Sequence, residues 1–276
     1  MDTTKIKDKI KKTRLSRIIR LIMRPYFVFV YLLSSFQGWL RNKNIVKSTK
    51  YQYLLNLKQI HAGERCFVVA TGPSLTFEDL DMIKGEYCFG MNSCVLALDK
   101  TQWTPNVLAI QDEFVYNKIQ NVLVKESQNR LKNKIWVSNT ISSMFDSAKT
   151  FRQFPLHYLD HKYDPDKILE LRFSENPYVN VFDGYSIIFS VLQLAVYMGF
   201  KEIYLLGTDC NYKQPQKNFI EHGATALNNL DIAGTRLIVA HQEFKKFADS
   251  KGVKIINCTR GGMLEVYPRM KLEEVI

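Results

Sequence analysis

Short runs of apolar residues alternate with longer stretches of mixed polarity from about residue 63 to the end of the chain. Runs that are almost continuously apolar are typical of strands buried on both faces of a parallel sheet. The runs that predict strands are Arg65–Ala70, Tyr87–Met91, Asn106–Ile110, Ile135–Asn139, Lys201–Leu206 and Val253–Cys258. Because helical stretches separate them with short connections, the pattern predicts an α/β fold with a doubly wound, mostly parallel, Rossmann-like sheet.

The ends of the predicted helices carry their own signals. Thr76 is followed by acidic residues in the first turn, which is typical of a capped helix N-terminus. Gly199 and Gly252 directly follow the helical stretches Tyr185–Met198 and Arg236–Lys251, where a C-terminal capping glycine belongs.

The first 60 residues differ from the rest of the chain and form a separate predicted segment, 1–60, in front of a domain at 61–276. Basic residues alternate with apolar ones up to Arg24, Pro25 interrupts, and an aromatic-rich run continues from Tyr26 to Leu40. The segment lacks the cleavage site of a signal peptide and the roughly 20 uninterrupted apolar residues of a spanning helix. The pattern favours a helical segment that associates with a membrane surface, and an oligomerisation arm is the alternative.

The distribution of charge supports this division. Residues 1–60 hold 14 Lys/Arg and two Asp, a net charge of +12, whereas residues 61–276 hold 24 basic and 25 acidic residues, a net charge of −1. The neutral domain is not expected to bind nucleic acid. The basic segment is expected to hold the protein peripherally at an anionic membrane, on its cytoplasmic face.

Cysteine spacing gives no sign of a metal site. None of the five cysteines forms a C-x-x-C pair, and several fall in strand-like runs, so the sequence predicts buried free thiols. Asp164-Pro165-Asp166 resembles a metal-binding Asp-x-Asp, but no clear strand precedes it, and we interpret it as a turn.

Ligands of a parallel α/β sheet bind beyond the carboxyl ends of its strands, and small or polar residues follow several predicted strands. Thr71-Gly72-Pro73-Ser74 follows the first strand and leads into the capped helix, so its backbone could approach a phosphate. No Lys follows the glycine, which excludes a Walker A loop. A tight strand–helix turn is the alternative. The other strands end in Asn92, in Asp112, in Gly207-Thr208-Asp209 and in Thr259-Arg260-Gly261-Gly262.

Two segments, Val68–Leu75 and Leu194–Asp209, together with the Gly-Met-Asn-Ser after the second strand, resemble bacterial sialyltransferases of glycosyltransferase family 42. They also resemble the broader group that includes 6-hydroxymethylpterin pyrophosphokinase-like proteins. The similarity covers roughly residues 64–262. It implies a GT-A-like variant of the Rossmann-like fold and a metal-independent, inverting transfer of a sugar from a nucleotide donor, with a CMP-type donor favoured and no cofactor. The acceptor would be a surface glycan or a lipid-linked hydroxyl.

The resemblance also implies roles for individual residues. His222 would deprotonate the acceptor, Asp209 would act with it, and Tyr212 would donate to a donor phosphate. The expected nucleotide-binding residues are Thr71, Gly72, Pro73, Ser74, Asn92, Asp112, Gly207, Thr208 and Tyr212, and no metal ligand is expected. His157 and His161 are candidates for contacts with the acceptor, whereas His241, beside Phe244 on a helix, favours a structural role.

Two other functions stay open at this point. One is an ATP-dependent pyrophosphokinase of a pterin-like heterocycle, which leaves the basic segment unexplained. The other is a non-catalytic nucleotide-binding scaffold in a membrane complex. The sequence does not fix the oligomeric state, and a homo-oligomer remains open.

Overall fold

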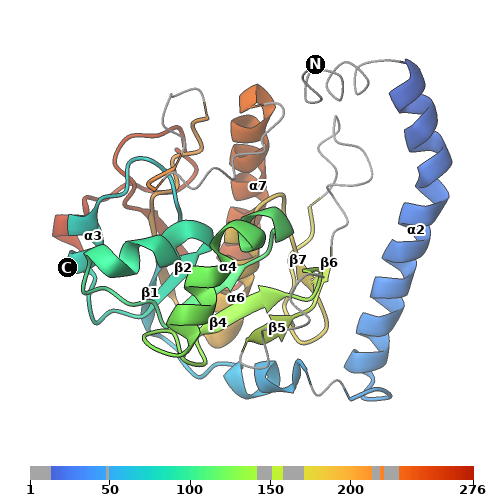
Figure 1. Ribbon diagram of the computed structural model, residues 1–276, viewed down its shortest axis with the longest axis horizontal. Helices are drawn as coiled ribbons and strands as arrows, with labels where there is room; N and C mark the ends of the chain where they lie inside the picture. The colour runs from blue at the N-terminus through green and yellow to red at the C-terminus, as the bar shows by residue number, and fades with distance from the viewer. Residues whose placement is uncertain (1–13, 48–49, 142–150, 158–170, 213–217, 221–229) are drawn as a thin grey trace.

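The computed structural model describes residues 14–47, 50–141, 151–157, 171–212, 218–220 and 230–276. The chain forms an α/β body with one long helix, α2, along one side (Figure 1). None of the described helices combines the length and the apolar content that crossing a bilayer requires.

A parallel sheet of seven strands forms the centre of the body, in the order β5-β4-β3-β2-β1-β8-β9. Its strands are β1 (Arg65–Val69), β2 (Cys88–Met91), β3 (Val107–Ile110), β4 (Ile135–Ser138), β5 (Arg152–Phe154), β8 (Glu202–Leu206) and β9 (Lys254–Asn257). All six strands that the sequence predicts are present, and the doubly wound parallel fold is confirmed. β5 is additional and forms one edge of the sheet.

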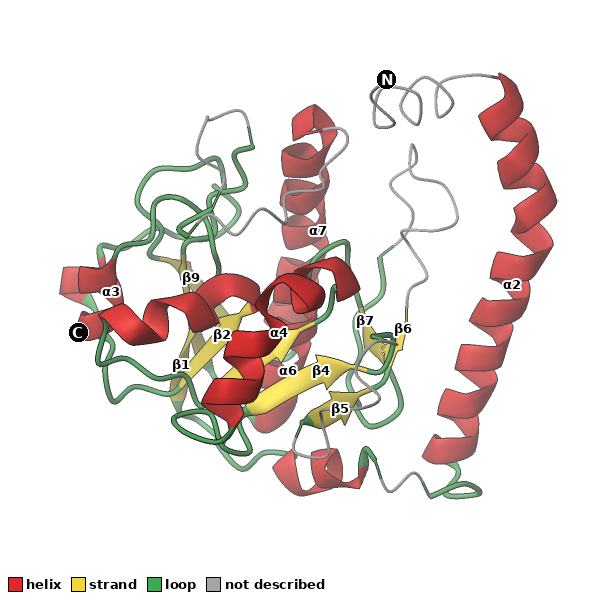
Figure 2. Ribbon diagram, in the orientation of Figure 1, coloured by secondary structure: helices red, strands yellow, loops and turns green. Residues whose placement is uncertain are grey.

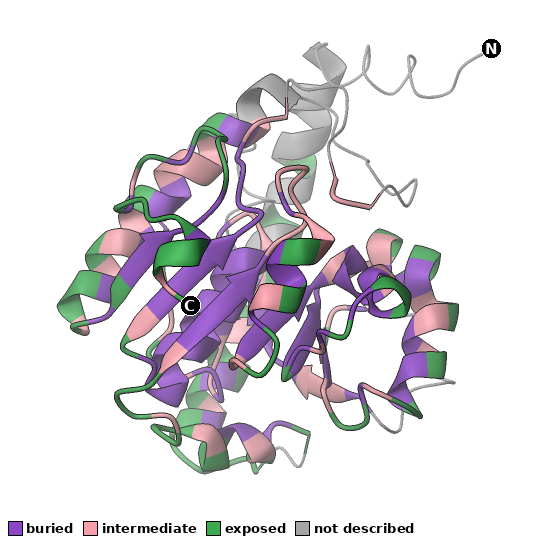
Figure 3. Cartoon of the chain, turned by 90° about the vertical axis from the view of Figure 1, so that its left-hand side faces the viewer, coloured by how far each residue is buried: buried purple, intermediate pink, exposed green. Residues whose placement is uncertain are grey.

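Helices cover both faces of the sheet (Figure 2). Alternate residues of β1 point to opposite sides, so that Cys66 and Val68 join one apolar cluster and Phe67 and Val69 the other. The first cluster contains α6 (Ile187–Met198) and α7 (Leu230–Ser250); the second contains α3 (Phe77–Met82), η2 (Asn92–Lys100) and α4 (Glu113–Ser127). The strands are accordingly buried almost throughout (Figure 3).

The predicted helix ends have the expected capping geometry. Thr76 and Asp79 form a capping box, in which the Thr76 hydroxyl accepts from the Asp79 amide and the Asp79 carboxylate accepts from the Thr76 amide. Gly199 ends α6 in the left-handed conformation, with φ of 100°. The five cysteines are free and buried, as predicted.

The N-terminal helix differs from its prediction at Pro25, where an interruption was expected. α2 (Arg14–Asn42) continues through Pro25 as one helix. A proline removes one intrahelical hydrogen bond, and the docking of the later turns of α2 onto the body offsets that loss. The docking partner is a small second sheet of β6 (Leu156–His157) and β7 (Val181–Phe182).

The packed body begins before the predicted boundary at residue 60. The 3-10 helix η1 (Gln52–Leu57) follows α2, and Tyr51 and Leu54 are buried in the same cluster as α6. The amides of Gln59 and His61 donate to the carbonyls of Tyr197 and Met198. Residues 51–60 are therefore packed with the α/β domain, although the prediction assigned them to the N-terminal segment.

Candidate functional site

The order of the strands creates a switch point between β1 and β8. From β1 the chain proceeds strand by strand to β5, and it then returns to the other side of β1 to form β8 and β9. The connections leave β1 and β8 on opposite faces, so a crevice opens beyond the carboxyl ends of these two strands. The loop that contains Gly72 and the loop that contains Asp209 both start there.

These two loops are joined directly. The Gly72 amide donates to the Gly207 carbonyl over 2.8 Å, and the Ser74 hydroxyl donates to the Asp209 carboxylate over 2.8 Å. A Cβ atom at Gly72 would collide with the Asp209 carboxylate and the Gly207 carbonyl. Gly72 is therefore required by the contact between the two loops, independently of any ligand.

Asp209 is a buried carboxylate that holds these loops together. Only 8% of the residue is exposed, and burial raises the pKa of its carboxyl, while the Ser74 hydrogen bonds oppose that shift. Tyr212 lies nearby, and burial raises the pKa of its phenol, reinforced by Cys210 and Asp209. Burial thus disfavours the charged forms of the Asp209 carboxyl and the Tyr212 phenol.

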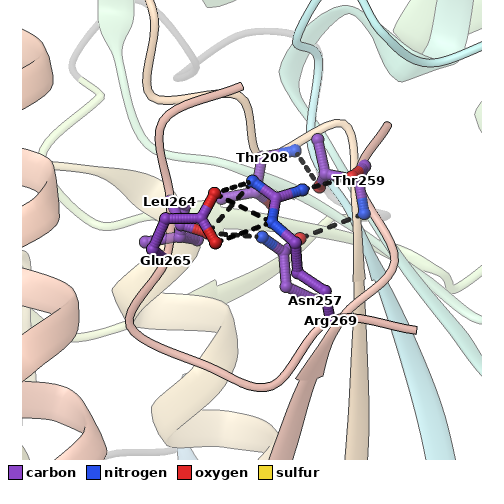
Figure 4. A network of polar contacts seen from close by, with 6 residues as sticks. All are labelled: Thr208, Asn257, Thr259, Leu264, Glu265 and Arg269. Atoms are coloured by element: carbon purple, nitrogen blue, oxygen red, sulfur yellow. Dashed lines mark hydrogen bonds and ion pairs between the residues drawn. The ribbon is translucent and has the colours of Figure 1, made fainter. Parts of the chain in front are cut away.

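A polar network joins the carboxyl ends of β8 and β9 (Figure 4). The Thr208 amide donates to the Thr259 hydroxyl over 3.0 Å, and the Thr259 amide donates to Asn257. Arg269 donates to the Thr259 carbonyl and pairs with Glu265. Thr208 is therefore held in place by its neighbours on the loop after β9.

The glycine-rich turn after β9 supports the Asp209 loop from behind. Gly262 lies so close to the Asp209 backbone that an added Cβ would be 2.7 Å from its carbonyl oxygen. The Met263 amide donates to that carbonyl over 2.7 Å. Arg260, in the same turn, forms an ion pair with Asp79 at the start of α3.

Asn92 and Ser93, at the end of β2, present unsatisfied polar atoms. The Asn92 side-chain oxygen and the Ser93 hydroxyl are buried, and neither has a hydrogen-bond partner among the residues that the structure describes. Asn92 also has a positive φ of 48°, a conformation that costs a non-glycine residue free energy. A polar ligand in the crevice could supply the hydrogen bonds that these two buried atoms lack.

A second left-handed turn lies at the same edge of the sheet and was missed by the sequence prediction. Gly184 and Tyr185 both have positive φ angles, of 52° and 73°, immediately before α6. The Ser190 hydroxyl donates to Gln111 beyond β3 over 2.6 Å, which places the first turn of α6 at the carboxyl edge. The Asp-Gly pair ahead of a long apolar stretch is the signal that could have revealed this turn.

The remaining predicted residues occupy different positions. Thr71 accepts a hydrogen bond from the Phe219 amide through its carbonyl, and Pro73 is half-buried in the same loop. Asp112 is exposed and caps α4, where its carboxylate accepts from the Val115 amide. Capping fully accounts for an aspartate at this position.

The histidines are widely separated. His157 lies buried against α2, with Nε2 3.2 Å from the Ser35 hydroxyl, and burial lowers its pKa. His241 is buried in the core beside Tyr267, in agreement with its structural interpretation. His222, His161 and the Asp164–Asp166 turn lie outside the described residues. The described part of the chain contains no group of three or more His, Cys, Asp or Glu side chains placed to hold a metal.

Fold and site together define an α/β domain of the doubly wound type with a crevice at the switch point of its parallel sheet. The chain belongs to the family of 6-hydroxymethylpterin diphosphokinase MptE-like proteins, whose match covers residues 39–215. This confirms the broader group to which the strand-end motifs pointed.

Among solved structures, the chain is similar to the MAf glycosyltransferase from Magnetospirillum magneticum AMB-1, with 16% sequence identity and a TM-score of 0.48. The similarity covers 81% of this chain and 38% of that one, so this chain spans well under half the length of that protein. No curated protein sequence matches the chain significantly.

Proposed function

We propose that the crevice between β1 and β8 binds the phosphate-bearing part of a nucleotide donor and that the protein is a glycosyltransferase. The observation that carries this proposal is the joining of the Gly72 and Asp209 loops at the switch point, with the unsatisfied Asn92 and Ser93 at its rim. The Ser93 hydroxyl can donate to a phosphate oxygen there, and such a donor stabilises a leaving phosphate without a cation.

The finer assignments rest on the sequence resemblance. The donor would be a CMP-type nucleotide sugar, such as an activated sialic acid, and the acceptor a hydroxyl of a surface glycan. The acceptor oxygen would bond to the anomeric carbon as the bond from that carbon to the phosphate oxygen breaks. The nucleotide would leave with the bonding electrons, and the acceptor proton would pass to His222. Asp209 would hold the Ser74 loop in the geometry that this transfer requires.

A matched pair of substitutions tests the nucleotide site. Asn92 and Asn133 both have positive φ angles, of 48° and 61°, but Asn133 lies in the turn before β4, at the other end of the sheet. Glycine tolerates this conformation, so Asn92→Gly and Asn133→Gly should both fold. Asn92→Gly should weaken nucleotide binding by about tenfold or more, because the loss of one good polar contact costs about that much.

Isothermal titration calorimetry with CMP, CDP, UDP, GDP and ATP, with and without Mg²⁺, measures the nucleotide affinity of both variants and of the wild type. A nucleotide that binds the wild type and Asn133→Gly, but not Asn92→Gly, supports the site. Equal affinities for all three proteins would refute the placement of the nucleotide. Incubation of the preferred nucleotide sugar with glycan acceptors then tests transfer, and a tightly bound nucleotide without turnover would favour the scaffold function.

A diphosphokinase is the second candidate, and membership of the family named after that activity favours it. It would transfer the terminal diphosphate of ATP to a hydroxymethyl oxygen and release AMP. Titration with ATP and Mg²⁺, followed by an assay for AMP released in the presence of 6-hydroxymethylpterin, separates the two. If AMP forms only when the pterin is present, the protein is a diphosphokinase and the glycosyltransferase proposal is wrong.

A further inference from the structure

Helix α2 docks onto the body through its small and polar side chains. Ser35 contacts His157, and Tyr31 packs edge-on against the same imidazole with ring centroids 5.0 Å apart. Gly38 lies against Asn180, where a Cβ would come within 2.6 Å of the side-chain nitrogen. These residues recur at three- and four-residue intervals and therefore lie on one side of the helix.

Arg41 completes the docked side. Its guanidinium donates to the carbonyls of Tyr178 and Val179 over 3.1 and 2.6 Å, and the residue is 8% exposed. Burial of an arginine whose guanidinium donates to two backbone carbonyls fixes the end of the helix to the loop before β7. The orientation of α2 about its own axis is thereby set.

The opposite side of α2 is apolar and exposed. We call the following residues the apolar face of α2: Ile22, Tyr26, Phe29, Leu32, Leu33, Phe36 and Trp39. Between 43% and 69% of each is accessible. At 100° per residue all seven fall on one side of the helix, away from the docked residues.

This arrangement reverses the usual one, in which a surface helix buries its apolar stripe against the body. Contiguous exposed apolar patches of this kind mark sites of interaction with another molecule or with a membrane. Phe36 and Trp39 stack on each other, with ring centroids 5.8 Å apart, which extends the aromatic surface along the helix. We therefore expect another molecule or a membrane to cover the apolar face.

The charge of the surrounding segment indicates the nature of that occupant. Residues 1–60 carry 14 Lys/Arg against two Asp, a net charge of +12. Four arginines, at positions 14, 17, 20 and 24, belong to the first turns of α2, and Lys43 and Lys47 follow the aromatic part. Basic residues beside an apolar, aromatic helix face are typical of helices that lie in the interface of an anionic membrane.

We propose that the apolar face of α2 is a membrane-binding surface that inserts in the plane of an anionic phospholipid layer. Because Arg41, Gly38 and Ser35 fix the helix to the body, the whole α/β domain is held in one orientation against that layer. The inference is independent of which reaction the crevice performs.

A second copy of the chain is the competing occupant, since residues 22, 26, 29, 33 and 36 follow the spacing of a coiled-coil seam. Two such helices packed in parallel would bring their basic turns together and repel each other. The aromatic content also favours lipid, because Tyr and Trp are enriched at the headgroup level of membranes.

Trp39 allows a direct test on the wild-type chain. The other two tryptophans, Trp103 and Trp136, are 1% and 2% exposed, whereas Trp39 is 48% exposed. Vesicles of phosphatidylcholine with phosphatidylglycerol brominated in the acyl chains should quench part of the fluorescence. Trp39→Phe should bind the same vesicles with its remaining fluorescence unquenched.

A sedimentation assay with the same lipids tests the face itself. The double variant Phe29→Ser, Phe36→Ser should bind anionic vesicles at least about tenfold more weakly, because two half-exposed aromatic rings lose their apolar contact. Phe114→Ser, on α4, is the matched control, since Phe114 is also exposed, at 46%, and its loss should leave binding unchanged. Salt near 1 M should weaken wild-type binding without abolishing it.

Three results would overturn the proposal. The first is wild-type protein that sediments with neither neutral nor anionic vesicles. The second is a double variant that binds as well as the wild type. The third is a wild-type dimer, seen by analytical ultracentrifugation without lipid, that the double variant dissociates while vesicle binding is absent, which would assign the face to a second copy.

Discussion

The imidazole of His241 lies in the core on α7, with Nδ1 3.1 Å from the hydroxyl oxygen of Tyr267. Burial lowers the pKa of His241 from 6.5 to about 3, so the folded protein holds the neutral form. The unfolded chain takes up a proton below about pH 6.5, and the folded chain resists it. The stability that this site contributes is therefore complete above pH 6.5 and is lost as the pH falls towards 3.

We expect the free energy of unfolding to fall by about 1.4 kcal/mol per pH unit from this one site below pH 6.5. Between pH 6.5 and 5 the loss is about 2 kcal/mol, and His241→Gln should lack it while being less stable at neutral pH. Guanidinium chloride unfolding of both proteins at pH 7.5 and 5 measures the difference. The same pH slope in wild type and variant would show that another group causes the loss.

Single residues at the switch point show where sequence reasoning was limited. The sequence singled out Gly72, Ser74 and Asp209 one by one, because each follows a strand. It could not reveal that the Ser74 hydroxyl donates to Asp209 or that Asp209 occupies the space beside Gly72, since these contacts join residues about 135 positions apart. Gly72→Val is consequently a poor probe of nucleotide binding, because it would force the two loops apart in the free protein.

At the scale of elements, two capping glycines provide a matched comparison. Gly199 and Gly252 both follow helices in the left-handed conformation, with φ of 100° and 63°. A Cβ at Gly199 would come within 3.0 Å of the Ala62 backbone, whereas at Gly252 the nearest atom is the Lys201 ammonium nitrogen at 3.8 Å. Crowding is thus confined to Gly199.

Gly252→Ala should cost about 1–2 kcal/mol, the price of placing alanine in the left-handed conformation. Gly199→Ala should cost at least about 1 kcal/mol more, because the Ala62 backbone must also move. Denaturant unfolding of the two variants measures both values. Equal losses of unfolding free energy in the two variants would mean that the Ala62 backbone can move away from the end of α6 without an energetic cost.

The elements that the sequence predicted well are the long and strongly patterned ones. The six predicted strands are four or five residues long and buried on both faces, so their apolar runs are unbroken. β6 and β7 have only two residues each, which leaves no period to detect. The path of α2 through Pro25 was missed because tertiary docking by Arg41 and Ser35 is not visible in local propensity.

At the scale of the whole molecule, the sequence predicted candidate residues for the crevice because ligands of this fold bind at the carboxyl ends of its strands. The sequence prediction placed Asn92, Thr208 and Asp209 at the carboxyl edge of the sheet, where the structure also has them. The turn of Gly184 and Tyr185 was missed, since it precedes a helix and follows a strand too short to predict. Which strands become neighbours depends on long-range packing, so the switch point itself emerged only from the sheet order.

The boundary between α2 and the α/β body leads to a last prediction, on two shortened chains. A chain that starts at Lys50 keeps Tyr51 and Leu54, which are 8% and 0% exposed in the core. It loses the Arg41 hydrogen bonds, which stabilise by about 1.5–3 kcal/mol when the donor is charged. It should therefore unfold cooperatively, with moderately reduced stability.

A chain that starts at His61 also loses η1, and with it the buried side chains of Tyr51 and Leu54 and the pairing of Gln59 with Tyr197. Loss of a single buried leucine side chain costs about 2–5 kcal/mol, so this chain should be at least about 3 kcal/mol less stable than the one that starts at Lys50. Urea unfolding followed by far-ultraviolet circular dichroism compares the two. Equal midpoints would show that η1 packs on a domain that is already complete, and that the α/β body begins at residue 61.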